Sequence, residues 1–195
     1  LYFNYNNVTL AYLCYTQEWY KGCIMQTPFL KQAVEKEVNS NVQTKITKCI
    51  SDMENSLKNK GYTIKTTGTK KAVVELVPKK IIITPDISMV ITKGEESWSF
   101  PSSRFQIEAK SGSYELVMIV TSVLGFEAGY GDSIPELYMY TYPNLRVQKI
   151  KQEDGTKIYL LSDRNTGEYI QFATRSVAWP PGMIFNTEKG QIAIK

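Results

Sequence analysis

One apolar stripe constrains the fold of this chain more than any other feature of its sequence. Between residues 30 and 57 apolar side chains recur at steps of three or four, a period typical of one helix face. Thr27 can cap such a helix and Pro28 suits its first position. Lys58, Lys60 and Gly61 are typical of a helix end. The sequence therefore predicts an amphipathic helix of about 30 residues, some 45 Å long. Its stripe comprises Leu30, Val34, Val38, Val42, Ile46, Ile50, Met53 and Leu57.

Most of the remaining chain has the composition of strands separated by turn residues. A second, shorter and mostly apolar helix is expected from Tyr114 to about Glu127. We predict an α+β protein: a long amphipathic N-terminal helix packed on a mostly antiparallel sheet, a second short buried helix and a β-rich C-terminal part. The expected parts are an N-terminal strand segment (1–26), a helix-plus-meander domain (27–130) and a C-terminal subdomain (131–195). Strands are expected at 8–15, 62–66, 72–77, 80–84, 89–92, 104–109, 145–149, 157–161, 169–173 and 191–194.

Composition narrows the classes of function. Hydrophobic residues make up 43% and charged residues 22% of the 195 residues, which is ordinary for a globular protein. The net charge of +4 comes from scattered lysines rather than a basic stripe with interleaved aromatics, so we expect no nucleic-acid partner. No histidine is present, which removes the usual general base and the commonest metal ligand. No apolar run approaches the roughly 18 residues that span a bilayer.

Three cysteines limit the covalent chemistry. Cys14, Cys23 and Cys49 form no Cys-x-x-Cys pair, so we expect no metal and no cofactor. If the long helix is continuous, Cys49 lies about 30 Å along it, whereas the chain from Cys23 to the helix start reaches about 17 Å. A Cys23–Cys49 disulfide is therefore excluded unless the helix breaks near Asn39. We expect Cys14–Cys49 as the first choice of disulfide and Cys14–Cys23 as the second.

No motif for catalysis is recognisable. Glu127 and Asp132 flank a glycine-rich loop and could converge, but no further group of an acid–base site accompanies them. The sequence contains neither a nucleophile elbow nor a phosphate-binding loop. We therefore predict no catalytic and no cofactor-binding residues. An extracellular glycan hydrolase with two carboxylates remains an alternative, as does a small-ligand binding module with an apolar pocket.

Two stretches carry a family resemblance: "YLCYTQEWYKGCIMQTPFLKQAVEKEVNSNVQTKITKC", followed by "GYTI", and "DRNTGEYIQFATRSVAWPPG". They are similar to uncharacterised membrane-anchored surface or exported proteins of small-genome archaea, from about Tyr12 to Gly182. The resemblance implies a Tyr- and Cys-bearing strand, a long helix containing a Cys, and then a sheet. It implies no catalytic residues. It implies a location, namely an exported ectodomain whose membrane anchor precedes Leu1.

Three features of the residues agree with export. The chain begins at Leu1 and not Met, its cysteines can form a disulfide, and Asn7-Val8-Thr9 matches the N-glycosylation pattern with Asn7 as the acceptor. We expect a cell-surface or extracellular protein that acts through protein–protein contacts, as a homo-oligomer or with other surface proteins. One form is a filament subunit whose N-terminal strand adds to a neighbour's sheet edge. The contact candidates are Tyr2, Tyr5, Val8, Leu10 and Tyr12.

A Trp-Pro-Pro-Gly corner punctuates the C-terminal region. Proline donates no backbone hydrogen bond, and the residue before it is held extended, so we expect the last strand before Pro180 to end near Trp179. Trp179 is expected to cover the end of the C-terminal sheet. We interpret the corner as a structural stop rather than a binding site.

Overall fold

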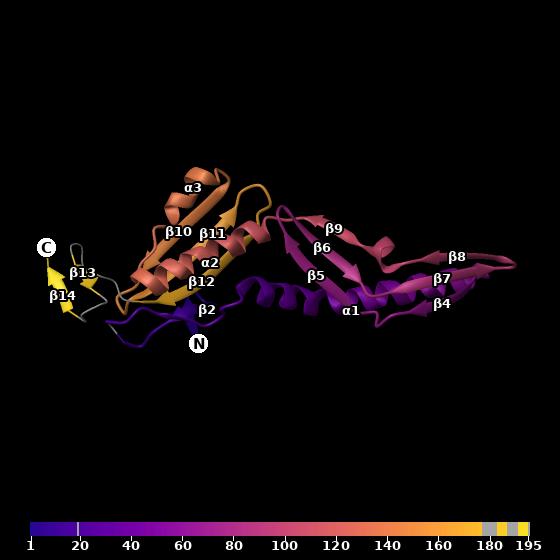
Figure 1. The fold of residues 1–195 in the computed structure, drawn as a ribbon, viewed down its shortest axis with the longest axis horizontal. Coiled ribbons are helices and arrows are strands. Elements are labelled where there is room, and N and C mark those ends of the chain that lie inside the picture. Colours follow the sequence, from indigo (N-terminus) through magenta and orange to yellow (C-terminus); the bar gives the residue numbers. More distant parts are fainter. Residues whose placement is uncertain (19, 177–182, 187–190, 195) are drawn as a thin grey trace. The chain divides into compact units, whose positions relative to one another are not determined.

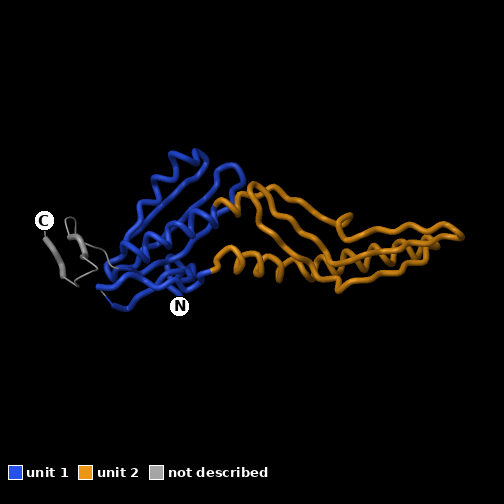
Figure 2. Tube along the Cα trace, in the orientation of Figure 1, with its two compact units in different colours: residues 1–28, 116–195 blue, residues 29–115 orange. Residues whose placement is uncertain are grey.

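The computed structural model describes residues 1–18, 20–176, 183–186 and 191–194 and confirms the α+β class (Figure 1). The chain forms two compact units (Figure 2). Unit 1 combines residues 1–28 with residues 116–195, and unit 2 is the continuous segment 29–115. The expected N-terminal segment and C-terminal subdomain therefore belong to one unit. Among the described residues no helix is long and apolar enough to cross a membrane.

A mostly antiparallel sheet forms the body of unit 1. Helix α2 (Ser113–Tyr130) runs across the face of β11 and β12 (Figure 1) and buries apolar residues between Leu116 and Leu124. Its other face is open, because Met118 and Phe126 are exposed. One pair of neighbours, β12 and β2, is parallel. The strand order is β1 (Tyr2–Tyr5), β2 (Val8–Tyr15), β12 (Tyr169–Arg175), β11 (Thr156–Asp163) and β10 (Leu145–Lys151), with β3 (Ile24–Met25) beside β2.

Short elements complete unit 1. The 3₁₀ turn η2 (Pro135–Leu137) and the single-turn α3 (Tyr138–Thr141) lie between α2 and β10. Strands β13 (Met183–Asn186) and β14 (Gln191–Ile194) pair antiparallel with each other, and β14 has the predicted bounds. Trp179 and its neighbouring prolines lie outside the described residues, so the expected role of that corner stays a prediction.

Unit 2 places α1 (Leu30–Asn59) against two three-stranded antiparallel sheets. The helix is continuous through Asn39, and its stripe packs through Ile46, Met53 and Leu57 on a cluster that includes Met89. Phe29 precedes its first turn without a side-chain cap, so the expected cap at Thr27 is wrong. The sheets are β4 (Thr63–Thr67), β7 (Ser88–Lys93) and β8 (Glu96–Phe100), and β5 (Ala72–Val77), β6 (Lys80–Pro85) and β9 (Ile107–Lys110), with η1 (Ser102–Phe105) before β9.

Side chains of α1 bind the open edge of β5 as a neighbouring strand would. Gln43 accepts a hydrogen bond from the Ala72 amide at 2.9 Å, and Glu35 accepts one from the Leu76 amide at 2.8 Å. Eight helical residues rise about 12 Å and four strand residues about 13 Å, so the two spacings match. Gln43 also donates to the Lys70 carbonyl at 2.9 Å. The helix therefore satisfies edge groups that would otherwise be open to another strand.

Candidate functional site: a buried lysine between two carboxylates

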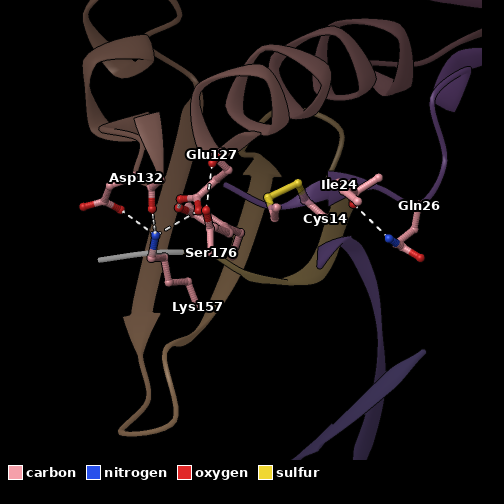
Figure 3. Close-up of a disulfide and its surroundings, with 10 residues drawn as sticks. Cys14, Ile24, Gln26, Glu127, Asp132, Lys157 and Ser176 are labelled. Atoms are coloured by element: carbon pink, nitrogen blue, oxygen red, sulfur yellow. Dashed lines mark hydrogen bonds and ion pairs between the residues drawn. A yellow bond between two sulfur atoms is a disulfide. The ribbon is translucent and has the colours of Figure 1, made fainter. Parts of the chain in front are cut away.

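The most unusual chemistry of the described residues surrounds Lys157, which lies near the start of β11. Its side chain is 1% exposed, and the Glu127 side chain beside it is 0% exposed. Charged residues are almost never fully buried unless they are paired. The Lys157 ammonium lies 2.9 Å from Glu127 Oε2 and 3.2 Å from Asp132 Oδ1, and it also donates to the Gly131 carbonyl. Figure 3 shows Lys157 Nζ between these groups. The three ammonium hydrogens thus have three acceptors.

The end of α2 supplies Glu127 and holds it in place. The second carboxylate oxygen, Oε1, accepts a hydrogen bond from the Tyr159 hydroxyl. The Glu127 carbonyl accepts one from the Ser176 hydroxyl at 2.8 Å, so a residue just after β12 fixes the backbone (Figure 3). Ser133 Oγ lies 3.0 Å from the Tyr159 hydroxyl. Every polar atom of the Glu127 carboxylate is therefore engaged inside unit 1.

Asp132 follows the helix and meets three lysines. Lys149 donates to its Oδ1, and Lys151 lies 3.2 Å from its Oδ2. Lys149 also donates to the Ser133 carbonyl at 2.6 Å. Unlike Glu127, the Asp132 side chain is 37% exposed, so it lies at the boundary between the cluster and solvent. We call Glu127, Asp132, Lys149, Lys157 and Tyr159 the lysine cluster.

The environment separates the acid–base properties of these groups. Burial raises the pKa of Asp132, but hydrogen bonds from Lys149 and Lys151 and the charges of Lys157 and Lys149 lower it more, so the Asp132 pKa lies well below its ordinary range. Burial, the Glu127 charge and the bond to Glu127 together raise the pKa of Tyr159 well above its ordinary range. Tyr159 is therefore a permanent proton donor, and Asp132 a permanent anion, at neutral pH.

The convergence of Glu127 and Asp132 does not form a hydrolase site. A glycosidase needs two carboxylates that face a cleft with room for the sugar and water. Glu127 has no exposed surface and holds two donors of its own chain. A pocket of about 540 Å³ lies instead in unit 2, and no carboxylate lines it. Seven of its eight lining residues have a polar or charged side chain. The lining consists of Asn39, Ser40, Gln43, Thr47, Thr69, Lys70, Lys71 and Ala72.

The disulfide lies close to the cluster (Figure 3) and corrects the first-choice pairing. Cys14 of β2 bonds to Cys23, with Cα atoms 5.4 Å apart. The expected Cys14–Cys49 bond is wrong, because β2 turns back into β3 and brings Cys23 beside Cys14, while Cys49 is a free, exposed residue of α1. Gly22 also fits closely, since a Cβ there would lie 2.4 Å from the Ala128 carbonyl oxygen. The second-choice pairing is confirmed.

The predicted contact residues of the β1–β2 hairpin differ in exposure. Tyr2 and Val8 are 73% and 48% exposed. Leu10 and Tyr12 are instead buried against β11 and β12, with Tyr5 packed beside them, so they serve the core of unit 1. Asn6 and Asn7 both have positive φ, as a two-residue hairpin turn requires. The turn leaves Asn7 exposed, and its glycosylation stays a prediction.

The sequence contained one usable signal for the lysine cluster. The glycine-rich loop draws attention to Glu127 and Asp132, whereas Lys157 and Tyr159 have no distinguishing local pattern, because an isolated lysine in a strand usually points to solvent. Four consecutive residues of β11, Thr156 to Tyr159, are all buried, and Lys157 is the only charge among them. A strand buried on both faces leaves such a lysine no route to water.

Comparison of the chain with protein-family models, curated proteins and solved structures gives no match.

Proposed function

We propose that this protein is a non-enzymatic structural protein of the cell surface or extracellular space, which acts through protein–protein contacts at the free edge of β1. The Cys14–Cys23 disulfide indicates an oxidising environment. The resemblance to surface or exported proteins of small-genome archaea supports the same location. The partner is a second copy or another surface protein.

The observation that carries the proposal is the difference between the two edges of the unit 1 sheet. Natural edge strands are usually protected from unwanted pairing by charges, proline or bulges. The outer strand β10 follows this rule, with Arg146 and Lys151 exposed on it. No side chain between Leu1 and Tyr15 is charged, and none is proline. No charged side chain and no proline of this segment therefore opposes the pairing of another strand with the β1 edge.

The hairpin register identifies the backbone groups that are free to pair. Tyr12 donates from its amide to the Leu1 carbonyl at 3.0 Å, and Tyr5 lies opposite Val8 across the two-residue turn. Because paired and unpaired positions alternate along an antiparallel ladder, the backbone groups of Tyr2 and Asn4 face outward. Strand addition at these groups would extend the sheet without disturbing the hairpin.

The test is substitution of the outward amide at Asn4. Asn4→Pro removes one outward N–H and keeps the β1–β2 ladder, while Asn4→Ala keeps the N–H. Both variants lose the hydrogen bond from Thr9 to the Asn4 side chain, so they form a matched pair. We expect the wild type and Asn4→Ala to assemble in sedimentation and electron microscopy, and Asn4→Pro to remain monomeric. Assembly of Asn4→Pro, or a strictly monomeric wild type at high concentration, would contradict the proposal.

Removal of residues 1–13 tests the proposed contacts less specifically than the Asn4 variants do. It deletes Leu10 and Tyr12, which are 3% and 8% exposed, and with them the 2.8 Å hydrogen bond between Tyr12 and Thr156. We therefore expect the truncated chain to lose stability as well as contacts.

A further inference from the structure

We propose that Lys157 and Asp132 condense to an intramolecular isopeptide bond, so that the loop after α2 is covalently joined to β11. The bond forms between Lys157 Nζ and Asp132 Cγ, and Glu127 transfers the protons. This inference rests on the lysine cluster alone and is independent of the proposed contacts at β1.

Proximity favours the reaction. Lys157 Nζ lies 3.2 Å from Asp132 Oδ1, so the amine is in direct contact with the carboxylate whose Cγ it attacks, and residues on both sides fix the two groups. Condensation of an amine with a carboxylate is unfavourable between separate molecules in water. Well-oriented groups of one molecule, however, reach effective concentrations of about 10⁵–10⁸ M. A folded unit that holds the two groups in contact can therefore favour the amide.

Glu127 is suited to move the protons. Its Oε2 lies 2.9 Å from Lys157 Nζ, so it can accept a proton from the ammonium and leave a nucleophilic amine. Both side chains are buried, 1% and 0% exposed, so the proton passes directly between them and not through bulk water. The Tyr159 hydroxyl holds the other oxygen of Glu127 and keeps the carboxylate oriented.

Asp132 is suited to be the electrophile. Lys149 and Lys151 donate to its two oxygens, where negative charge develops when nitrogen attacks Cγ. Its side chain is also 37% exposed, which gives the departing water a route to solvent. The charged partners that hold its pKa low thus also stabilise the tetrahedral intermediate.

The atoms balance without a further reactant. The N–C bond forms, one C–O bond of Asp132 breaks, and that oxygen leaves as water with two of the three ammonium protons. Glu127 takes up and returns a proton and ends unchanged. Nothing is oxidised or reduced, and the positive and negative charges disappear together.

The primary experiment is the intact mass of the full chain after reduction of the disulfide. We expect the wild type to be lighter than its sequence by the mass of one water. Proteolysis should yield one branched peptide that joins residues 132 and 157. An unshifted mass, or a branched peptide that joins other residues, would overturn the proposal.

A matched substitution identifies the electrophile. Asp132→Asn leaves the geometry nearly unchanged, but its condensation releases ammonia in place of water. The wild type and Asp132→Asn should therefore converge on the same final mass and the same branched peptide. Loss of one water from Asp132→Asn would show that another carboxyl group reacts, and would contradict the assignment.

Two further variants test the nucleophile and the proton carrier. Lys157→Met and Glu127→Gln should both keep the mass of their sequences, with folding checked by circular dichroism. Condensation in a folded Glu127→Gln protein would contradict the role of Glu127. The Lys70–Glu54 ion pair of unit 2 is the internal control, because its atoms lie 2.8 Å apart but Lys70 is 35% exposed. The peptides that contain Lys70 and Glu54 should have the masses of their unmodified sequences. Where Glu127→Gln fails to fold, the mass of Asp132→Asn still decides whether the bond between residues 132 and 157 forms.

Discussion

The two units bury apolar cores of different size and close their structures by different means. Unit 1 closes its N-terminal segment with the Cys14–Cys23 disulfide and joins α2 to β10 and β11 through the lysine cluster, in which Lys157 is 1% exposed. Unit 2 has no disulfide and closes its β5 edge with helix side chains at Glu35 and Gln43. Buried charges are costly when a partner is lost, whereas edge groups near the surface can turn to water. The comparison predicts that unit 1 tolerates single substitutions less well than unit 2.

The largest effect is expected from Lys157→Met in unit 1. The substitution removes the buried partner of Glu127, and loss of one member of a buried polar pair costs about 3–5 kcal/mol of unfolding free energy. The matched change in unit 2 is Lys70→Met. The Lys70 ammonium is partly exposed to water, and its partner Glu54 also accepts a hydrogen bond from Thr66. We expect that change to cost about 1 kcal/mol or less. Urea unfolding followed by hydrogen exchange in each unit would measure both, and equal costs would erase the contrast.

Removal of the disulfide is the next largest perturbation. Cys14 and Cys23 are separated by 9 positions, and opening so short a loop costs about 2–3 kcal/mol through the entropy of the unfolded chain. We expect Cys14→Ser with Cys23→Ser to increase hydrogen exchange in unit 1 only. Cys49→Ser is the control, because Cys49 is free and exposed. A stability loss from Cys49→Ser of the same size would argue against the observed pairing.

A smaller effect is expected where the helix covers the edge of β5. Gln43→Ala removes the acceptor of the Ala72 amide and the donor to the Lys70 carbonyl, which costs about 1 kcal/mol because water can replace the side chain. Gln32→Ala, on the exposed face of the same helix, is the control. Exchange of the Ala72 amide should rise in the first variant and stay unchanged in the second.

The smallest predicted effect concerns alkaline pH. The pKa of Tyr159 is raised above the ordinary 10.0 by burial and by Glu127, so the unfolded chain releases this proton before the folded one does. The stabilising contribution is complete below pH 10 and is lost as the pH rises further. The stability advantage of the wild type over Tyr159→Phe should therefore shrink by up to about 1 kcal/mol between pH 10 and 11. An advantage that grows over this range would contradict the sign.

Regular periods in the sequence predicted most of the fold. The eight-residue stripe defined α1, and alternation defined β2 and β5 with the observed bounds. Strand β8 was missed, because "ESWSF" has no alternation of buried and exposed residues, and four of its five positions are exposed. The expected strand at 104–109 began too early, since its first residues form η1. The single expected meander became two sheets, because β4 pairs with β7 across β5 and β6, a choice that depends on tertiary packing.

The site was less predictable than the fold. The sequence brought Glu127 and Asp132 to attention through the loop between them, and both contact Lys157. Their contacts depend on how α2 packs on β11, and no local pattern of the sequence encodes this packing. The predicted Cys14–Cys49 disulfide is wrong for a related reason. The prediction rested on the length of α1, whereas the pairing depends on the antiparallel contact of β2 with β3.

The parallel pairing of β2 with β12 has a consequence for how the chain reaches its folded state. Residues 29–115 are contiguous, so they can fold before residues 116–195 have been made. The N-terminal hairpin has to wait for Ala173–Arg175, because these residues form its other neighbour. Until then β2, which has no charged side chain, lacks its partner β12 and can bind a chaperone or another chain. Synthesis order alone thus delays the pairing of β2 with β12 until residues 173–175 have been made.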